Sequence, residues 1–274
     1  MQSSHPNILE KKYKKLVLQI SFHEVSFCLY NTLDHKIETF GSYILTKTNS
    51  FKDTETEIIN LIKQSTVLQS GFDNVIVLHN NTLNCFVPQA LFDEKSLISY
   101  LQYNVKVYEN DYVAYDEISN NEMNTVYIPF VGINNSLLDI YQTFIFKHSH
   151  TVLVKKIIEL AKNSIEPQLY VHIEEHHFQL IAVKNQKMIL FNTFDFTSDQ
   201  DFIYHLLFAI EQLKFNPETI QVKLLGNIHQ ESELFSIAYK YIRNVALFTD
   251  HYNSDQMITQ ENYLKHFILI HACE

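Results

Sequence analysis

Two segments of this chain, residues 16–30 (LVLQISFHEVSFCLY) and 169–183 (LYVHIEEHHFQLIAV), each predict two strands joined by a very tight turn. Neither turn contains glycine. A similar series of elements follows each hairpin, so the chain is expected to contain two copies of one structural unit. This repetition constrains the fold more than any other feature, because each copy must bury an equivalent sheet.

The first hairpin is followed by a series of strand and helix patterns that predicts the order βββαβαβ. Within the first helical pattern (KDTETEIINLIKQSTVLQ), Thr54 and Glu57 fit a capping box. The other predicted elements are a third strand at 36–45, a buried strand at 74–79, a helix near 93–103 and a strand at 124–131.

The second hairpin begins the same order again, with one more strand at the end. A third strand (KMILFNTF) is followed by a helix with Ser198 as its N-cap. A strand at 219–225, a helix (QESELFSIAYKYI) and two strands (NVALFT and HFILIHA) complete the copy. A helix that Pro167 ends (HTVLVKKIIELAKNSIEP) connects the two copies. The predicted domains are therefore residues 1–150 and 151–274, the second including the connecting helix.

Composition narrows the functional classes. The 274 residues are 46% apolar, enough for a sizeable core, and the net charge of −10 argues against binding DNA or RNA. No run of about 18 apolar residues predicts a membrane span, and the N-terminal residues lack the apolar region of a signal peptide. Cys28, Cys85 and Cys273 form no metal-binding spacing, and Cys28 and Cys273 are expected in the core. A cytoplasmic protein with reduced thiols is expected.

Three stretches, VYIPFVGINNSL and FKHSHTVL in mid-chain and LLGNIHQESELF near residue 230, add to the repeated order of elements. Together they resemble the actin-like ATPases, which are built on a duplicated ribonuclease-H-like fold, and in particular an uncharacterised family of Bacteroidetes proteins with that fold. The resemblance covers nearly the whole chain. It implies an α/β fold with two ribonuclease-H-like halves and mixed sheets flanked by helices, but it does not imply ATP hydrolysis.

In active members of that superfamily, each half begins with a hairpin that holds phosphates and carries an Asp and, soon after it, a Gly. Glycine is needed because backbone N–H groups must approach the phosphate without a Cβ in the way. On this chain the Asp positions correspond to Gln19 and His172, and the Gly positions to Ser21 and Glu174. Bulky turn residues and added negative charge therefore predict that neither hairpin binds a nucleotide.

One part of the superfamily pattern remains. Gly226 corresponds to one glycine of the pair that holds the adenosine end, and Asn227 replaces the other. A glycine between a strand and a helix is common in α/β proteins, so this match keeps ATP with Mg as an alternative cofactor rather than the expected one.

Other constellations are weaker. Glu174, Glu175, His176 and His177 have the residue types of a metal site, but no second His or acidic spacing supports one, and a polar hairpin tip is the preferred interpretation. The segment FKHSH (146–150) lies at the start of the connecting helix, where its histidines either bond loop carbonyls or line a cleft. Neither a GxSxG motif nor an acidic residue on the first strand occurs, which argues against a serine hydrolase and a ribonuclease-H-like nuclease.

The sequence favours a non-catalytic scaffold or protein-interaction module of the actin-like fold, with no catalytic residues, metal or cofactor. The alternative is a divergent ATP-binding protein of the same superfamily. A protein partner is expected, with no nucleic acid and no membrane span, and the oligomeric state is left open. Tyrosines at turns and edges (Tyr103, Tyr108, Tyr112 and Tyr115) are candidates for a partner surface.

Overall fold

The computed structural model describes residues 11–46, 50–69, 71–118, 122–249, 252 and 258–273. The N-terminal segment that was considered for a signal peptide lies mostly outside the described residues. The chain forms two compact units. Unit 1 contains the chain up to His79, Phe130–Phe146 and Cys273, and unit 2 contains Asn80–Pro129 and Lys147–Ala272. The predicted division at residue 150 concerns sequence repeats rather than compact units, and it stays a prediction.

The first five-stranded sheet has the order β3-β2-β1-β4-β8. Its central strand β1 pairs antiparallel with β2 and parallel with β4. β1 is a nearly continuous apolar run because both faces of the sheet are covered. The strands are β1 (Lys14–Ile20), β2 (Glu24–Asn31), β3 (Lys36–Ile44), β4 (Asn74–His79) and β8 (Ile145–His148), and the helices are α1 (Phe51–Gln64) and α3 (Val131–Tyr141).

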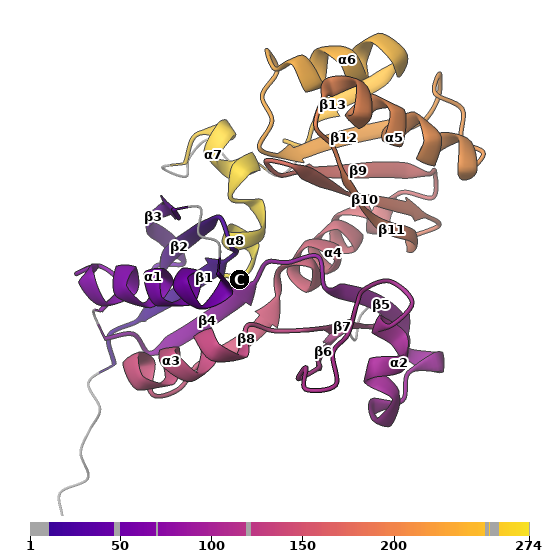
Figure 1. Cartoon of the computed structure of the whole chain (residues 1–274). Coiled ribbons are helices and arrows are strands. Elements are labelled where there is room, and N and C mark those ends of the chain that lie inside the picture. The colour runs from indigo at the N-terminus through magenta and orange to yellow at the C-terminus, as the bar shows by residue number, and fades with distance from the viewer. Residues whose placement is uncertain are drawn as a thin grey trace, which may run out of the picture. The chain divides into compact units, whose positions relative to one another are not determined.

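The second five-stranded sheet has the same order, β11-β10-β9-β12-β13. Helices α5 and α6 pack their apolar sides on this sheet (Figure 1). Ser198 caps α5 as predicted, accepting a hydrogen bond from the Asp201 N–H. The elements are β9 (Gln168–Ile173), β10 (His177–Lys184), β11 (Lys187–Asp195), β12 (Gln221–Gly226), β13 (Asn244–Leu247), α5 (Asp199–Gln212) and α6 (Glu233–Tyr241). The two matching sheets confirm the predicted pair of ribonuclease-H-like halves.

A three-stranded sheet of order β5-β7-β6 is inserted after β4. The helix predicted near 93–103 and the strand predicted at 124–131 belong to this insertion, so their assignment to the first copy was wrong. The final helix and strand of that copy are α3 and β8 instead. The insertion contains β5 (Asn84–Pro88), the 3₁₀ helices η1 (Gln89–Leu91) and η2 (Glu94–Ser96), α2 (Leu97–Leu101), β6 (Ala114–Ile118) and β7 (Met123–Tyr127).

The predicted connecting helix is α4 (Ser149–Leu160), which a 3₁₀ turn, η4 (Ala161–Asn163), extends. The predicted strand HFILIHA is wrong, because this segment forms the helix α8 (Phe267–His271), which follows α7 (Gln260–Lys265) and packs on α4. The predicted capping box is also wrong. Helix α1 begins after Ser50, and Glu57 instead accepts hydrogen bonds from the Thr46 N–H and hydroxyl.

The three cysteines are buried and form no disulfide in the described part of the chain, and Cys28 and Cys273 lie in the core as predicted. Their sulfur atoms are 3.3 Å apart, and the Lys15 ammonium donates a hydrogen bond to the Cys273 carbonyl. No helix among the described residues is both long and apolar enough to cross a membrane.

Candidate functional site

The first hairpin turn, between β1 and β2 in unit 1, is closed by the side chain of Ser21. The Ser21 hydroxyl accepts hydrogen bonds from the N–H groups of His23 at 3.2 Å and Glu24 at 2.9 Å. The Ser21 N–H in turn donates to the Glu24 carbonyl at 3.0 Å. The backbone donors that a phosphate would need at this turn are therefore already paired within it.

The neighbouring side chains complete this closed turn. Gln19 is half-buried on β1, opposite Ser26 in the ladder. Phe22 packs against the rings of Phe51 and Phe130, with ring centres 5.0 and 4.7 Å away. A large side chain thus anchors the turn to the core of unit 1, where an anion-binding loop would have a small residue.

The second hairpin turn, between β9 and β10 in unit 2, surrounds the carboxylate of Glu174. One carboxylate oxygen accepts from Asn80 Nδ2 at 2.9 Å, and the other accepts from Gln179 Nε2 at 3.2 Å. Since Gln179 donates through its nitrogen, its oxygen accepts from His172 Nδ1 at 2.7 Å. His172 and Gln179 lie directly opposite each other on the two strands. His172 and Glu174, which stand at the Asp and Gly positions of the superfamily pattern, therefore belong to one connected network.

The network continues from the hairpin to the start of the connecting helix. The Ser149 hydroxyl, in the first turn of α4, donates to Asn80 Oδ1 at 2.7 Å. The chain of bonds thus runs from His172 through Gln179, Glu174 and Asn80 to Ser149. Each amide in it uses both its donor and its acceptor, so the orientation of the amides is fixed.

The imidazole of His148 caps α4, so segment 146–150 lies at the start of a helix as predicted, but His148 bonds a backbone N–H rather than a loop carbonyl. His148 Nδ1 accepts from the His150 N–H at 3.1 Å. The His148 N–H and the Thr151 hydroxyl both donate to the buried carboxyl of Asp116, at 2.8 and 2.7 Å. Burial raises the pKa of Asp116, and these hydrogen bonds oppose that effect.

The Glu174 carboxylate carries the negative charge of this site, and His177 Nε2 lies 3.4 Å from it. Burial alone would raise the pKa of Glu174, but the hydrogen bond from His177 and the neighbouring imidazoles outweigh it and lower the pKa to about 2. Burial opposes protonation of His177, yet the Glu174 carboxylate raises its pKa. Burial lowers the pKa of His172. Glu174 is therefore ionised at neutral pH, with both oxygens engaged, which suits a positioning role rather than proton transfer.

Gly226 ends β12 beside the second hairpin, and its conformation explains why the residue is glycine. Its φ is +90°, and a Cβ at this position would overlap the carbonyl oxygen of Ile173. Asn227, whose N–H donates to that same carbonyl at 2.7 Å, has an exposed side chain. The glycine thus allows β12 to lie against β9, and this packing accounts for it without a nucleotide.

Sequence reasoning grouped the residues of the second turn incorrectly. Alternation along a strand would place Glu174 and His176 on one face. The turn instead brings Glu174 near His172 and His177, and His176 contacts the exposed Glu175. Among the described residues, no group of three His, Cys, Asp or Glu side chains is arranged to hold a metal ion. The partners Asn80, Gln179 and Ser149 were missed. The two asparagines after the buried strand β4 were the available signal, since strand ends collect functional polar residues.

Comparison with known proteins identifies the family of this chain. The pattern of the family described as "Protein of unknown function (DUF3822)" matches residues 3–245. The chain belongs to this family. A search of curated proteins found no match.

Solved structures confirm the actin-like ATPase fold. A Bacteroides thetaiotaomicron protein described as having an actin-like ATPase fold and unknown function has a TM-score of 0.83 at 19% identity, over 98% of this chain and 100% of its own. A chain of a PilM–PilN type IV pilus biogenesis complex has a TM-score of 0.62 at 12% identity, over 94% and 98%. The ethanolamine utilization protein EutJ of Carboxydothermus hydrogenoformans has a TM-score of 0.50 at 9% identity, over 97% and 91%. These likenesses establish the fold alone.

Proposed function

We propose that this DUF3822 protein is a non-catalytic member of the actin-like fold that works by contact with a partner protein, as a scaffold or an interaction module. The observation that carries the proposal is the state of the two hairpin turns. Ser21 occupies the backbone donors of the first turn, and the Glu174 carboxylate takes the place of an anion in the second.

Electrostatics adds to this argument. Two unpaired negative charges at ~4 Å repel by about 1 kcal/mol in water and several-fold more in a shielded site. A triphosphate at the second turn would meet the Glu174 carboxylate and, beside it, the exposed Glu175. The net charge of −10 likewise supports a protein partner over a nucleic acid.

The similar chain in a PilM–PilN complex supports the same function by analogy, because a protein of this fold is there part of an assembly. The proposal includes a cytoplasmic location, which the three free cysteines support, since thiols remain reduced in that compartment.

The alternative function is a divergent ATP-binding protein, and its basis is the position of Gly226 between β12 and α6, where the superfamily has a glycine that holds the adenosine end. Melting of the protein with and without millimolar Mg–ATP separates the two functions. A ligand at 100 times its Kd stabilises the folded state by about 2.7 kcal/mol, which moves the melting temperature of a chain of this size by several degrees. We expect a shift of less than about 1 °C.

The matched variant for this test is Asn227→Trp, because the Asn227 side chain is exposed and a larger one fits without disturbing the core. Replacing Gly226 would be a poor test, since any side chain there strains the fold itself. A shift of several degrees in the natural protein that Asn227→Trp removes would overturn the scaffold proposal in favour of ATP binding.

A further inference from the structure

The edge strand β11 has few of the features by which edge strands are usually protected: one irregularity in its pairing with β10, opposite Ala182 and Val183, and charges only at its terminal residues Lys187 and Asp195. Between Lys187 and Asp195 its sequence MILFNTF contains neither a charge nor a proline. The corresponding edge strand β3 of the first five-stranded sheet carries Lys36 and Glu38. The opposite edge strands of the two five-stranded sheets, β8 and β13, have only four residues each. A long uncharged edge invites pairing with another strand, and natural proteins retain one where a partner covers it.

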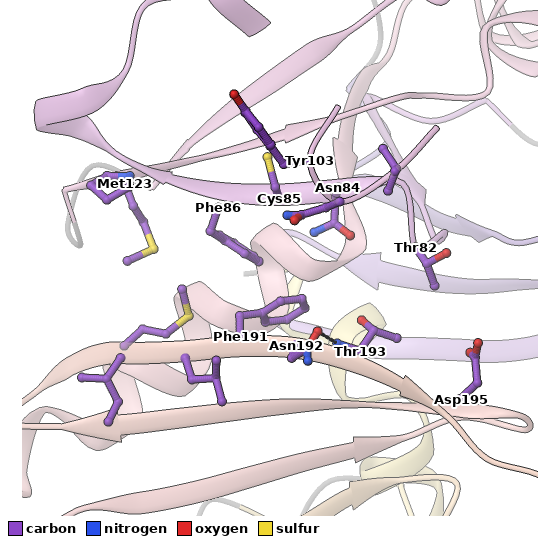
Figure 2. Close-up of a pocket in the computed structure, with 16 residues that line it drawn as sticks. Thr82, Asn84, Cys85, Phe86, Tyr103, Met123, Phe191, Asn192, Thr193 and Asp195 are labelled. Atoms are coloured by element: carbon purple, nitrogen blue, oxygen red, sulfur yellow. Dashed lines mark hydrogen bonds between the residues drawn. The ribbon is translucent and has the colours of Figure 1, made fainter. Parts of the chain in front are cut away.

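The hydrogen-bond register shows which backbone groups of β11 point outward. The Phe196 N–H donates to the His176 carbonyl, so every second residue back from Phe196 bonds to β10. The backbone groups of Phe191, Thr193 and Asp195 therefore face away from the sheet. Of these, the Thr193 N–H bonds to its neighbour's side chain, Asn192 Oδ1, at 3.0 Å (Figure 2), which is a local substitute for a ladder partner.

A second edge strand, β5, lies opposite β11 within unit 2. The bonds from Ile128 N to Leu83 O and from Gln89 N to Glu122 O fix its register with β7. By the same alternation, the backbone of Phe86 faces away from β7. Figure 2 shows Phe86 and Phe191 pointing toward each other from the two strands, and their ring centres are 4.6 Å apart.

A groove of about 860 Å³ runs between these two edges, within the roughly 300–1,000 Å³ of typical ligand sites. Asp195 is the one charged residue among the described side chains that line it, so no cation is present for a phosphate or a nucleotide. Apolar and polar side chains share the wall: Phe86, Met188 and Phe191 are among the apolar ones, and Asn84, Asn192 and Thr193 are among the polar ones.

Among the described residues near this groove, two buried polar atoms lack a hydrogen-bond partner: one belongs to Asn84, which lines the groove, and the other to His150, whose ring packs against Phe191. His150 Nδ1 donates to Asn84 Oδ1 at 3.1 Å, which leaves Asn84 Nδ2 as a donor and His150 Nε2 as an acceptor. In the described part of the chain neither atom makes a hydrogen bond, although Asn84 and His150 are 8% and 0% exposed. Asn84 lines the groove, but neighbouring atoms cover its amide nitrogen, so a bound segment would reach this donor only after the side chain turns.

We propose that the groove between β5 and β11 binds an extended peptide segment of a partner protein, with apolar side chains at alternate positions, which adds to β11 as a further strand. Main-chain bonds to Phe191, Thr193 and Asp195 supply register, and Phe86 with Phe191 accepts alternate apolar side chains. Asp195 selects a basic residue at its end of the segment. This inference rests on the proposed interaction function and names the chemistry of the partner.

The test begins with a displayed library of random nine-residue peptides, selected on the immobilised full chain. The tightest peptide is then synthesised with a fluorescent label, and its Kd is measured by anisotropy. The key variant is Thr193→Pro, which removes an outward N–H but no bond to β10. The matched control is Ser42→Pro on β3, which also faces outward because the Leu45 N–H bonds to the His23 carbonyl.

We expect selected peptides that alternate apolar residues and carry Lys or Arg at one end, and at least tenfold weaker binding to Thr193→Pro with less than a twofold change for Ser42→Pro. Asp195→Lys, a substitution at an exposed position, should weaken peptide binding similarly. It replaces Thr193→Pro as the test variant if Thr193→Pro does not fold. Equal binding to all variants, failure to select any peptide, or a homodimer that Thr193→Pro separates would each overturn the proposal. The proposed function has its own test, the melting experiment with Mg–ATP. A failure of the peptide proposal therefore leaves the result of that experiment unchanged.

Discussion

Replacing Glu174 with Gln removes the charge at the centre of the second hairpin turn and should destabilise the fold in a pH-dependent way. The carboxylate accepts from Asn80 and Gln179 and lies 3.4 Å from His177 Nε2, and its side chain is 20% exposed. In the variant an amide NH₂ would face one of these donors, so that a buried donor loses its acceptor.

The magnitude follows from the pKa. A folded pKa of about 2, against 4.5 for the unfolded chain, means that ionised Glu174 stabilises the fold by about 3 kcal/mol at pH 6. Because the folded pKa is the lower one, this stabilisation is complete above the unfolded pKa and is lost as the pH falls toward 2. It should decline to about half by pH 3.

Urea unfolding of the natural protein and of Glu174→Gln at pH 6 and pH 3 measures this difference. Glu175→Gln is the matched control, because the Glu175 side chain is 69% exposed and its one ion pair among the described residues is with His176, which is also exposed. We expect a loss of about 3 kcal/mol at pH 6 for Glu174→Gln and a clearly smaller loss at pH 3. A loss below about 1 kcal/mol, or one that does not change with pH, would refute the reasoning.

Three further substitutions test the local structure, each by urea unfolding at neutral pH. Gly226→Ala should cost about 2–4 kcal/mol, because φ is +90° and the new Cβ overlaps the Ile173 carbonyl; a cost near zero would contradict this. Ser21→Ala should cost about 1–2 kcal/mol through the loss of the acceptor for two turn N–H groups, and an unchanged stability would show that water replaces the hydroxyl. Ser198→Ala should cost about 1 kcal/mol as the N-cap of α5, and no measurable loss would argue against that cap.

The elements that the sequence predicted correctly have a strong local signal. The strands of the two hairpins have apolar residues in alternating or continuous runs. Helix α5 has both an N-cap and an apolar side. Strand β8 was missed because it is four residues long and only one of its residues is buried. The segment of α8 was predicted as a strand because a short apolar run fits a buried helix equally well.

The site was predicted only in part, for a different physical reason. Residues such as His172 and Glu174 stood out by their chemistry within one hairpin. Their partner Asn80 lies 94 positions away from Glu174 in the chain, and no local pattern reports such a contact. Periodicity likewise could not show that the strand at 124–131 belongs to an inserted sheet, since pairing between strands depends on the whole topology.

The network around Glu174 has a consequence for how family members diverge. A change of this carboxylate alone leaves the amide donors of Asn80 and Gln179 without their acceptor, and a change of Gln179 alone removes the acceptor of His172. Each such step costs a sizeable part of the 5–15 kcal/mol that holds a typical domain folded. Evolution at these positions should therefore proceed by joint substitution, with the four residues inherited or exchanged as a set.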